Sequence, residues 1–448
     1  MNPNPRLHPD DLPEDLGELH EFFRDSHPAD IAELMQRVDE EAALALFLAI
    51  DAELQAEILP ELGESLRESI LERLTHATLV PVLNEMESDD AADLMQELHE
   101  LDEALAEDVL ADQQLDQELR EDLDELLEHE DDTAGGVMAR EFVAVGRTMT
   151  VDEAIGEVRH LAEDREVDDI YAVYVVDEEG RLLGLVSLQR LLLARRGQRM
   201  DEIMDPDVIS VQADTDQEQV AALARKYDLV TIPVVDAQGV LLGRVTMDDV
   251  YDIAHEEAAE DISRLAGTVE DVLERSSLTV VRQRTPWLLV GLAGGLVNAL
   301  VMSRFEADLR ALLSASFFVP VVMGMGGNVA NQSATIVVRG LATGELQVKD
   351  LVPRLWKESK VGFALGLACS LVMLGVVWLW MGDGATAGVI ALAMACVITQ
   401  ATVMGAFVPL LLKWVGADPA MASGPFLSTS NDILGLSVYL LLISTLLT

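Results

Sequence analysis

Five long apolar segments fill the C-terminal part of the chain and constrain its fold more than any other feature. They lie at roughly 286–303, 311–338, 361–381, 386–412 and 421–447. Each is long enough to cross the roughly 30 Å hydrocarbon core of a bilayer. Because a backbone in lipid must satisfy its own hydrogen bonds, these segments are predicted to be helices. The chain is therefore predicted to be a multidomain α-helical membrane protein with a five-helix transmembrane domain over 286–448.

The charge of the chain is confined to the part that precedes these segments. Segment 286–448 holds eight acidic and eight basic residues, which leaves 72 acidic and 22 basic residues in segment 1–285 and accounts for the whole formal charge of −50. Such a surface repels nucleic acid, so we expect no nucleic-acid partner, and it attracts divalent cations. A solubilising surface or adaptation to a salty cytoplasm explains the same charge, and the sequence does not separate these explanations.

Two soluble domains are predicted before the membrane domain. Residues 18–130 carry Leu, Ala and Ile at helical spacing between acidic positions, which predicts an acidic bundle of short helices. Within 137–256, the run Val176-Asp-Glu-Glu-Gly-Arg-Leu-Leu-Gly184 recurs 59 residues later as Val235-Asp-Ala-Gln-Gly-Val-Leu-Leu-Gly243. The two copies, 137–196 and 201–256, each predict a β-α-β-β-α unit, and together they resemble a tandem CBS pair (α+β).

Basic residues set the predicted orientation of the membrane domain, because cytoplasmic loops carry an excess of Lys and Arg. A long connecting helix over 257–284 ends with Arg282 and Arg284, whereas the Met381-Gly-Asp-Gly connection between spans three and four has no basic residue. The N-terminus also lacks the apolar core of a secretory signal peptide. We therefore expect a multi-pass protein of the cell (inner or plasma) membrane, with its N-terminus in the cytoplasm and its C-terminus outside.

One carboxylate, Asp432, is predicted to be the single acid deep within the spans. A carboxylate in lipid costs roughly 2.5–3.5 kcal/mol on insertion scales, so it is retained where it meets water and a cation. The second span contains Gly326-Gly-Asn-Val-Ala-Asn-Gln-Ser-Ala-Thr335, whose amides either line a pore or join two helices. There is no His or Cys ligand set near the spans, and hard oxygen ligands favour Mg²⁺ over zinc or copper.

Three motifs, in this order, resemble the MgtE-type magnesium transporter and channel family: Gly326-Gly-Asn-x-x-Asn-Gln-Ser-Ala-Thr335, Ala417-Asp-Pro-Ala-Met and Ser430-Asn-Asp-Ile-Leu-Gly435. The resemblance implies a homodimer with a pore on its two-fold axis, where Asp432 of each copy binds hydrated Mg²⁺. It also implies that the connecting helix plugs the cytoplasmic mouth when Mg²⁺ is plentiful. Asn331 and Thr335 match pore-lining positions and Asp418 matches an acid at the mouth, and Asn328 offers an oxygen in the same stretch.

The same resemblance implies a regulatory role for the acids of the soluble half. In that role they bind Mg²⁺, which stabilises the closed state. The predicted regulatory residues are Glu57, Asp89, Asp93, Asp214, Asp216, Glu218, Asp228, Asp249, Asp252, Glu257, Glu260 and Asp261. Asp89 and Asp93 lie on one helix face because they are four residues apart. Since like charges repel, the interfaces between these acids should open without cations and close when Mg²⁺ bridges them.

The CBS copies differ in a motif that many such pairs use to bind the ribose of adenine nucleotides, Ser/Thr-x-x-Asp. The second copy keeps Thr246-Met-Asp-Asp249, but the first has Ser187-Leu-Gln-Arg190, which argues against a bound nucleotide.

The predicted function is a Mg²⁺-gated channel that imports Mg²⁺ down its electrochemical gradient. The alternatives are a transporter of Co²⁺ or Mn²⁺, because Val329, Ala330 and Thr402 depart from the family pattern, and a membrane magnesium sensor that transports nothing. With no nucleophile–base pair or phosphate-cradling loop in the sequence, we expect no enzyme and no catalytic residue.

Overall fold

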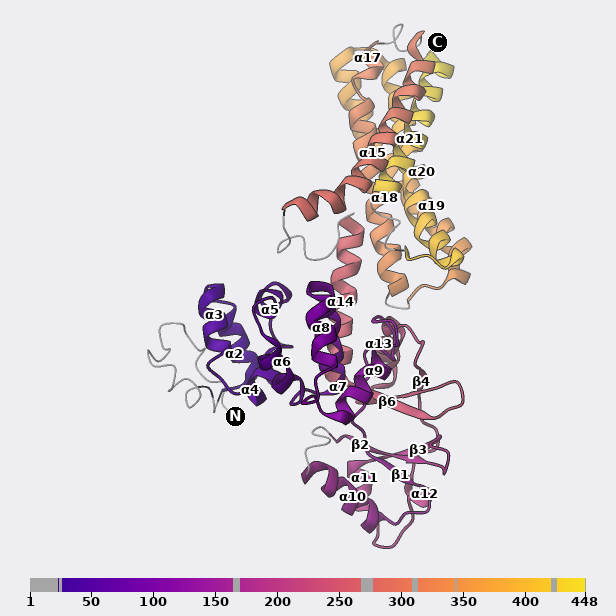
Figure 1. The fold of residues 1–448 in the computed structure, drawn as a ribbon. Helices are drawn as coiled ribbons and strands as arrows, with labels where there is room; N and C mark the ends of the chain where they lie inside the picture. The colour runs from indigo at the N-terminus through magenta and orange to yellow at the C-terminus, as the bar shows by residue number, and fades with distance from the viewer. Residues whose placement is uncertain are drawn as a thin grey trace. The chain divides into compact units, whose positions relative to one another are not determined.

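The chain forms two compact units, which meet in sequence between Glu256 and Glu257. The structure is a computed structural model that describes residues 23, 26–163, 170–266, 277–307, 313–342, 345–419 and 425–447. Figure 1 colours the first unit from indigo to magenta and the second from red to yellow.

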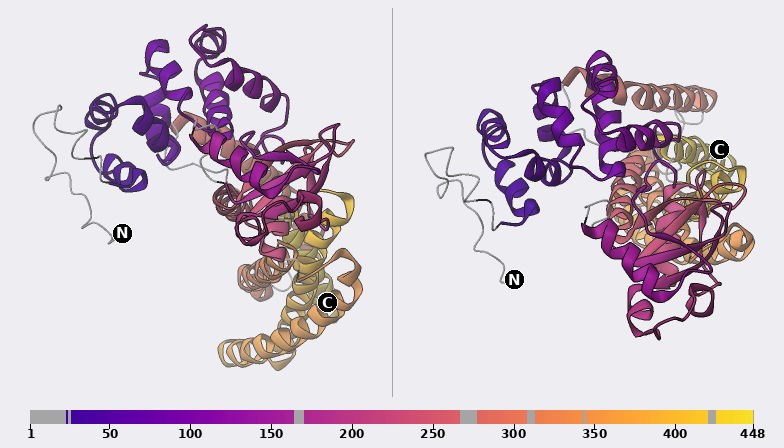
Figure 2. Two further views of the ribbon diagram at one scale, coloured as in Figure 1. Left: turned by 90° about the horizontal axis from the view of Figure 1, so that it is seen from below. Right: turned by 60° about the horizontal axis from the view of Figure 1, so that its bottom comes forward.

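The N-terminal domain of the first unit consists of short helices (Figures 1 and 2). They are α2 (Pro28–Met35), α3 (Glu40–Phe47), α4 (Ala52–Ile58), α5 (Glu64–Leu71), α6 (His76–Leu83), α7 (Ser88–Leu101), α8 (Glu103–Leu110) and α9 (Gln117–Leu126). Several begin at an aspartate whose carboxylate accepts a backbone N–H of the first turn, as Asp39, Asp51 and Asp102 do. The apolar faces bury Phe47 and Leu71 in a common core. The predicted acidic helical bundle is confirmed, and part of its acidity serves to cap helices.

Two sheets of identical topology confirm the predicted CBS repeat. One contains β1 (Ala144–Gly146), β2 (Ala172–Val176) and β3 (Leu182–Ser187), and the other contains β4 (Val211–Gln212), β5 (Thr231–Val235) and β6 (Leu241–Thr246). In each sheet the first strand is parallel to the second, and the second is antiparallel to the third. Gly180 and Gly239 turn the second strand into the third with φ of +80° and +84°, a conformation that favours glycine.

Helices flank both sheets. They are α10 (Val151–Glu163), α11 (Leu188–Leu193), α12 (Met200–Ile203), α13 (Gln217–Tyr227) and α14 (Met247–Ala266). The last of these starts in the second CBS copy and covers the first part of the predicted connecting helix, and α15 covers its last part from Ser277. Residues 267–276, and with them the predicted continuity of the connecting helix, lie outside the described residues.

The second unit is built from long apolar helices. They are α15 (Ser277–Arg304), α18 (Val319–Ala342), α19 (Leu351–Met381), α20 (Gly384–Val415) and α21 (Pro425–Leu447), with the short α17 (Leu313–Ser316) and η3 (Val348–Asp350). Within the described residues, five helical segments are long and apolar enough to cross a membrane: Val280–Arg304, Leu313–Ala342, Leu351–Met381, Gly384–Val415 and Phe426–Leu447. The predicted five-helix membrane domain is confirmed.

The third of these helices corrects the sequence prediction. It begins at Leu351 rather than near residue 361, so Arg354 and Glu358 lie inside a candidate span, and Glu358 is buried. The prediction that Asp432 is the single acid deep within the spans is therefore wrong. Charged residues lowered the hydropathy of 351–360, but Leu351 and Leu355 pack on a cluster of Val337 from α18 with Ala406 and Leu410 from α20, which supports the helix there.

Candidate cation sites

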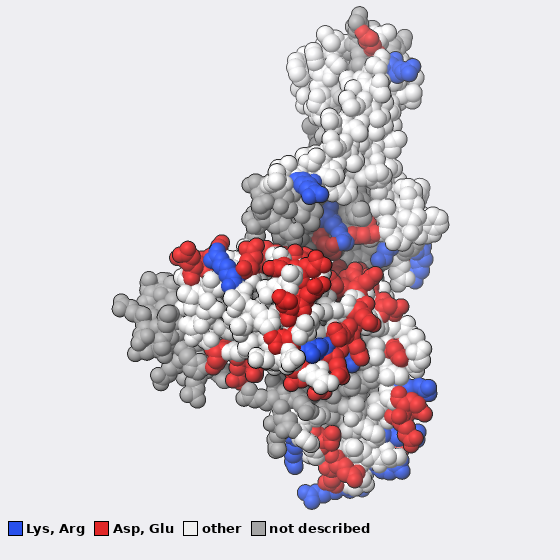
Figure 3. All heavy atoms as spheres, in the orientation of Figure 1, with Lys and Arg blue, Asp and Glu red and all other residues white. Residues whose placement is uncertain are grey.

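A group of carboxylates, here called the acid cluster, lies between α7 and the first turns of α14. Its members are Asp89, Asp90, Asp93, Asp248, Asp249, Asp252 and Glu256, each of which influences another member electrostatically. Figure 3 shows how densely Asp and Glu gather over the first unit compared with the mostly uncharged second unit. The predicted residues Asp89, Asp93, Asp249 and Asp252 are thus brought together, and Asp90, Asp248 and Glu256 are members that sequence reasoning missed.

Local structure explains why α7 presents its acids here. Asp89 and Asp90 occupy the first turn, where the partial positive charge of the helix N-terminus favours carboxylates. Glu141, from the segment before β1, accepts hydrogen bonds from the backbone N–H (3.0 Å) and the hydroxyl (2.8 Å) of Ser88. This contact holds the start of α7 against the CBS pair.

The carboxyls of the acid cluster raise one another's pKa. Burial, and then repulsion by Asp249, raises the pKa of Asp89 well above its usual range. The Asp90 and Asp93 side chains are exposed, but partial loss of water and nearby carboxylates raise the pKa of each to about 7. Arg67 acts against this shift at Asp93, yet its guanidinium also binds Glu97 at 2.6 Å. The cluster therefore carries more negative charge than its neighbours neutralise.

Asp249 has a structural role beside its place in the cluster. Its Oδ2 accepts the backbone N–H of Thr246 at 2.9 Å and the Thr246 hydroxyl at 2.7 Å, which caps the start of α14. Burial raises the pKa of Asp249, and the two hydrogen bonds from Thr246 partly oppose that shift.

The cluster is not a closed metal cage. No group of three His, Cys, Asp or Glu side chains in the described part of the chain is close enough to hold one ion directly. A cation with a retained water shell needs only one or two carboxylates, which is the usual manner of Mg²⁺ binding.

Other predicted regulatory acids lie at separate places in the first unit. Asp214, Asp216 and Glu218 lie at the N-terminal end of α13, where Asp216 accepts the N–H of Glu218 as the cap. Asp228 lies at the opposite end, roughly 16 Å away at 1.5 Å per residue, in a left-handed conformation. Glu57 is exposed on α4. The structure thus does not bring Asp228 together with the other three acids of this segment.

In the second unit, Asp418 pairs with an arginine that the sequence prediction did not include. The Arg264 guanidinium lies 2.6 Å from Oδ2 of Asp418 and also pairs with Glu260, one turn earlier on α14. Asp418 follows the end of α20, so this ion pair joins α14 to the connection between α20 and α21. Glu257 lies on the same helix, and the side chain of Asp261 lies outside the described residues.

The predicted pore residues on α18 share one uncovered face, here called the polar stripe. Asn328, Asn331 and Thr335 are three and four residues apart and all exposed, whereas Ala330 and Ala334 between them are buried. An exposed row of amide and hydroxyl groups is unusual on a membrane-spanning helix, because lipid offers such groups no hydrogen bonds.

Asp432 lies on α21, which packs against α15, α18 and α20. The side chain is partly exposed, and no basic residue among those described forms an ion pair with it. The preceding Asn431 is buried, and its Oδ1 has no hydrogen-bond partner. Amide and carboxylate oxygens therefore accumulate on α18 and α21 with few protein partners.

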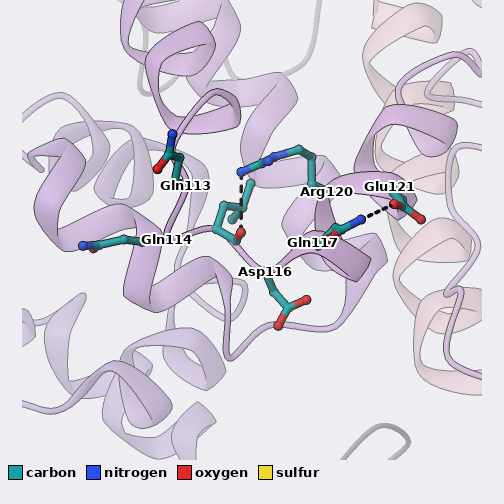
Figure 4. A pocket seen from close by; sticks show the side chains of 7 residues that line it. Gln113, Gln114, Asp116, Gln117, Arg120 and Glu121 are labelled. Carbon is teal, nitrogen blue, oxygen red and sulfur yellow. Dashed lines mark hydrogen bonds between the residues drawn. The ribbon is translucent and has the colours of Figure 1, made fainter.

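A separate pocket of about 630 Å³ lies at the connection between α8 and α9 (Figure 4). It is lined by Gln113, Gln114, Leu115, Asp116, Gln117, Arg120 and Glu121. Gln117 donates a hydrogen bond to Glu121 at 3.0 Å, and Arg120 donates to backbone carbonyls of the same loop. Because these groups bond to one another, we assign the pocket no function.

An acidic helical domain, a CBS pair and a five-helix membrane domain with uncovered oxygen donors define a membrane transporter of divalent cations. Comparison with known families agrees: residues 319–442 match the divalent cation transporter family MgtE, 26–132 match the MgtE intracellular N domain, and 134–197 and 200–256 match CBS domains.

Relatives at the level of whole chains give the particular family. The magnesium transporter MgtE of Thermus thermophilus is 39% identical over 79% of this chain and 78% of its own length. The Bacillus subtilis magnesium transporter MgtE is 33% identical over 82% of this chain and 79% of its own length. A crystal structure of the cytosolic domain of the Mg²⁺ channel MgtE in complex with ATP matches with a TM-score of 0.50 and 37% identity, covering 53% of this chain and 95% of that one. The chain belongs to the MgtE family of magnesium transporters.

Proposed function

We propose that this transporter is a homodimeric channel that carries Mg²⁺ into the cytoplasm down its electrochemical gradient, and that Mg²⁺ bound to the cytoplasmic acids closes it. The polar stripe on α18 is the single observation on which the assignment of a pore rests. Its amides and hydroxyl are uncovered in one copy of the chain, although the helix is apolar enough to lie in lipid.

A second copy of the chain explains why these polar groups are uncovered on a helix that lies in lipid. A two-fold axis beside α18 and α21 brings two polar stripes and two Asp432 carboxylates to a common path. Hydrated Mg²⁺ sheds water reluctantly and is held through its waters by one or two carboxylates, so two Asp432 side chains suit it. With the N-terminus in the cytoplasm and the C-terminus outside, a potential of 100 mV favours entry of this ion by about 4.6 kcal/mol.

Closure by Mg²⁺ follows from the uncompensated charge of the acid cluster. A cation that binds only the closed state stabilises it by RT ln(1 + [L]/Kd), about 1.4 kcal/mol per site when its concentration rises from a tenth of Kd to ten times Kd. Moving an equilibrium from 1:99 to 99:1 takes roughly 5.5 kcal/mol, or about four such sites. The dispersed placement of the acids, at the acid cluster, at both ends of α13 and along α14, supports several weak sites.

Flux through the purified protein tests the pore. In liposomes loaded with a Mg²⁺-sensitive dye, we expect flux from the wild-type protein and a loss of tenfold or more with Asp432→Asn. Glu345→Gln is the matched control, because Glu345 is an exposed acid in the connection between α18 and α19. Equal flux from the wild type and Asp432→Asn would remove Asp432 from the pore. No flux from any variant would favour the membrane sensor, and stronger competition by Co²⁺ or Mn²⁺ than by unlabelled Mg²⁺ would change the assigned ion.

Nucleotide binding is a second candidate property, which the ATP complex of the relative's cytosolic domain favours. In this chain Arg190 replaces the expected acid of the first copy, and the Asp249 carboxylate of the second copy already accepts two hydrogen bonds from Thr246. Equilibrium dialysis with ATP tests it. Saturable binding that Asp249→Asn abolishes would establish the property, and no binding would support the prediction from Arg190.

A further inference from the structure

A buried ion pair lies inside the second unit and includes no residue of the polar stripe. Nη2 of Arg354 lies 2.7 Å from Oε1 of Glu358, one turn further along α19, with side chains only 12% and 6% exposed. The other carboxylate oxygen, Oε2, accepts the hydroxyl of Ser333 on α18 at 3.1 Å. The ion pair therefore joins α19 to the helix that carries the polar stripe.

Ser333 lies on the side of α18 opposite the polar stripe. Each residue of an α-helix is turned by about 100° from the one before, so Ser333 points about 200° away from both Asn331 and Thr335. In agreement, Ser333 is buried while those two residues are exposed. A bond that holds Ser333 in one direction also determines where the opposite face points.

Close helix packing surrounds this bond. A Cβ added to Gly405 of α20 would lie 2.2 Å from the carbonyl oxygen of Ala330 and 3.0 Å from Cβ of Ser333. A Cβ added to Gly362 of α19 would lie 2.7 Å from Oγ1 of Thr402 on α20. These small-residue contacts set the separation of α18, α19 and α20. The hydrogen bond at Ser333 adds a directional constraint, which resists rotation of α18 about its axis.

We infer that Glu358 is a positioning residue for ion permeation. Held by Arg354, its carboxylate accepts the Ser333 hydroxyl and sets the rotation of α18 that directs Asn331 and Thr335 into the cation path. This inference rests on the proposed pore face of α18. Apolar residues in place of the pair would avoid the cost of removing two charges from water. The presence of the ion pair despite that cost fits a role in specifying the orientation of α18.

Cysteine accessibility measures the rotation directly. In a background with Cys369→Ala and Cys396→Ala, single cysteines are placed at Asn331 and at the neighbouring Gln332, which is turned by about 100°. The labelling rate of each with a water-soluble thiol reagent is measured in the full-length protein in liposomes. The ratio of the rate at position 331 to that at 332 reports which face of α18 meets water.

Ser333→Ala is the main variant, and Ser370→Ala is its matched control. Ser370 is a buried serine on α19 whose hydroxyl donates to the Leu367 carbonyl of its own helix. We expect Ser333→Ala to lower the labelling ratio threefold or more and to lower Mg²⁺ flux relative to Co²⁺ flux, while Ser370→Ala changes neither. Arg354→Met/Glu358→Leu, which removes the acceptor of the Ser333 hydroxyl and leaves no buried charge, should move the ratio in the same direction.

The outcomes separate this inference from the proposed pore. An unchanged ratio in Ser333→Ala and in Arg354→Met/Glu358→Leu, with or without a lower melting temperature, would overturn the positioning role and leave the pore intact. Absence of labelling at position 331 in the parent protein would overturn the pore face of α18, and the positioning role with it.

Discussion

The two units of this transporter treat their carboxylates in opposite ways. In the first unit, the acid cluster gathers acids from α7 and α14, and Arg67 near Asp93 and His255 near Asp252 act against the resulting rise in pKa. In the second unit, Glu358 and Asp418 each have an arginine within 2.7 Å, and Asp432 is the acid of the described spans without such a pair. The acids of the first unit thus repel one another, whereas the buried Glu358 of the second unit has its own charged partner.

This difference separates two uses of negative charge. Under the proposed function, the cluster that repels itself is the cation sensor, because bound cations lower its energy. A buried pair has its charge satisfied by the protein and gains nothing from external cations, so it can hold helices in place. Loss of one charge should therefore reduce the repulsion within the acid cluster of the first unit, but lower the stability of the second unit.

The largest expected effect comes from breaking the buried pair with Arg354→Met. Removing one partner leaves the other charge buried and costs roughly 3–5 kcal/mol. We expect little folded protein after purification in detergent, with a lower melting temperature by fluorescence-detected gel filtration. Arg354→Met/Glu358→Leu should recover much of the yield, because it leaves no charge behind. If Arg354→Met alone were as stable as the wild type, the contrast between the two units would be wrong.

Neutralising the acid cluster should have the next largest effect. Asp89→Asn/Asp93→Asn should move the ratio of closed to open channels at high internal Mg²⁺ by about tenfold, the loss of roughly 1.4 kcal/mol from one site. The measurement is current or liposome flux against internal Mg²⁺. Glu103→Gln/Glu107→Gln is the control, an exposed pair at the same spacing on α8. If both double variants were blocked like the wild type, the cluster would have no part in closure.

A smaller effect is expected from Arg264→Gln. The pair with Asp418 is partly exposed, with side chains 41% and 26% accessible, so it is worth about 1 kcal/mol or less. We expect a closed state that is two- to fivefold less populated at high internal Mg²⁺, measured by the same flux assay. Arg282→Gln, which removes an exposed base at the start of α15, serves as the control. Identical block in both variants would exclude the Arg264–Asp418 pair from closure.

The smallest expected effect is a dependence of stability on pH. Asp90 and Asp93 have a pKa of about 7 in the folded protein and about 3.9 when unfolded, so the folded state binds more protons between these values. In EDTA, stability should therefore fall as pH rises from about 4 to about 7, by roughly 1 kcal/mol or less because both side chains are exposed. Melting temperatures of the full-length protein test this. Asp90→Asn/Asp93→Asn should flatten the dependence, and an equally steep decline in that variant would assign it to other groups.

Local patterns in the sequence predicted much of the architecture. The 59-residue repeat corresponds strand by strand to β2 with β5 and β3 with β6, because the same local pattern forms the same hairpin twice. The five spans were predictable because length and hydropathy are local properties. The start of α19 was not, since Leu351 and Leu355 pack on a cluster formed by α18 and α20, which are distant in the sequence.

Local patterns did not predict contacts between side chains that are distant in the sequence. Nothing in the sequence near Asp418 indicates Arg264, 154 residues earlier, and nothing near Glu358 indicates Ser333 on another helix. The acid cluster was partly predicted through Asp89, Asp93 and Asp249, but only the meeting of α7 with α14 adds Asp90 and Asp248.

By itself, the sequence determined the order of domains, the number of spans and the presence of Asp432 in the last of them, because hydropathy, repeats and charge act over a few residues. The tertiary structure decided which charges are compensated. An ion pair depends on two side chains being within about 4 Å, and helix packing alone set that distance for Arg354 with Glu358, for Arg264 with Asp418, and for the repelling acids of the first unit.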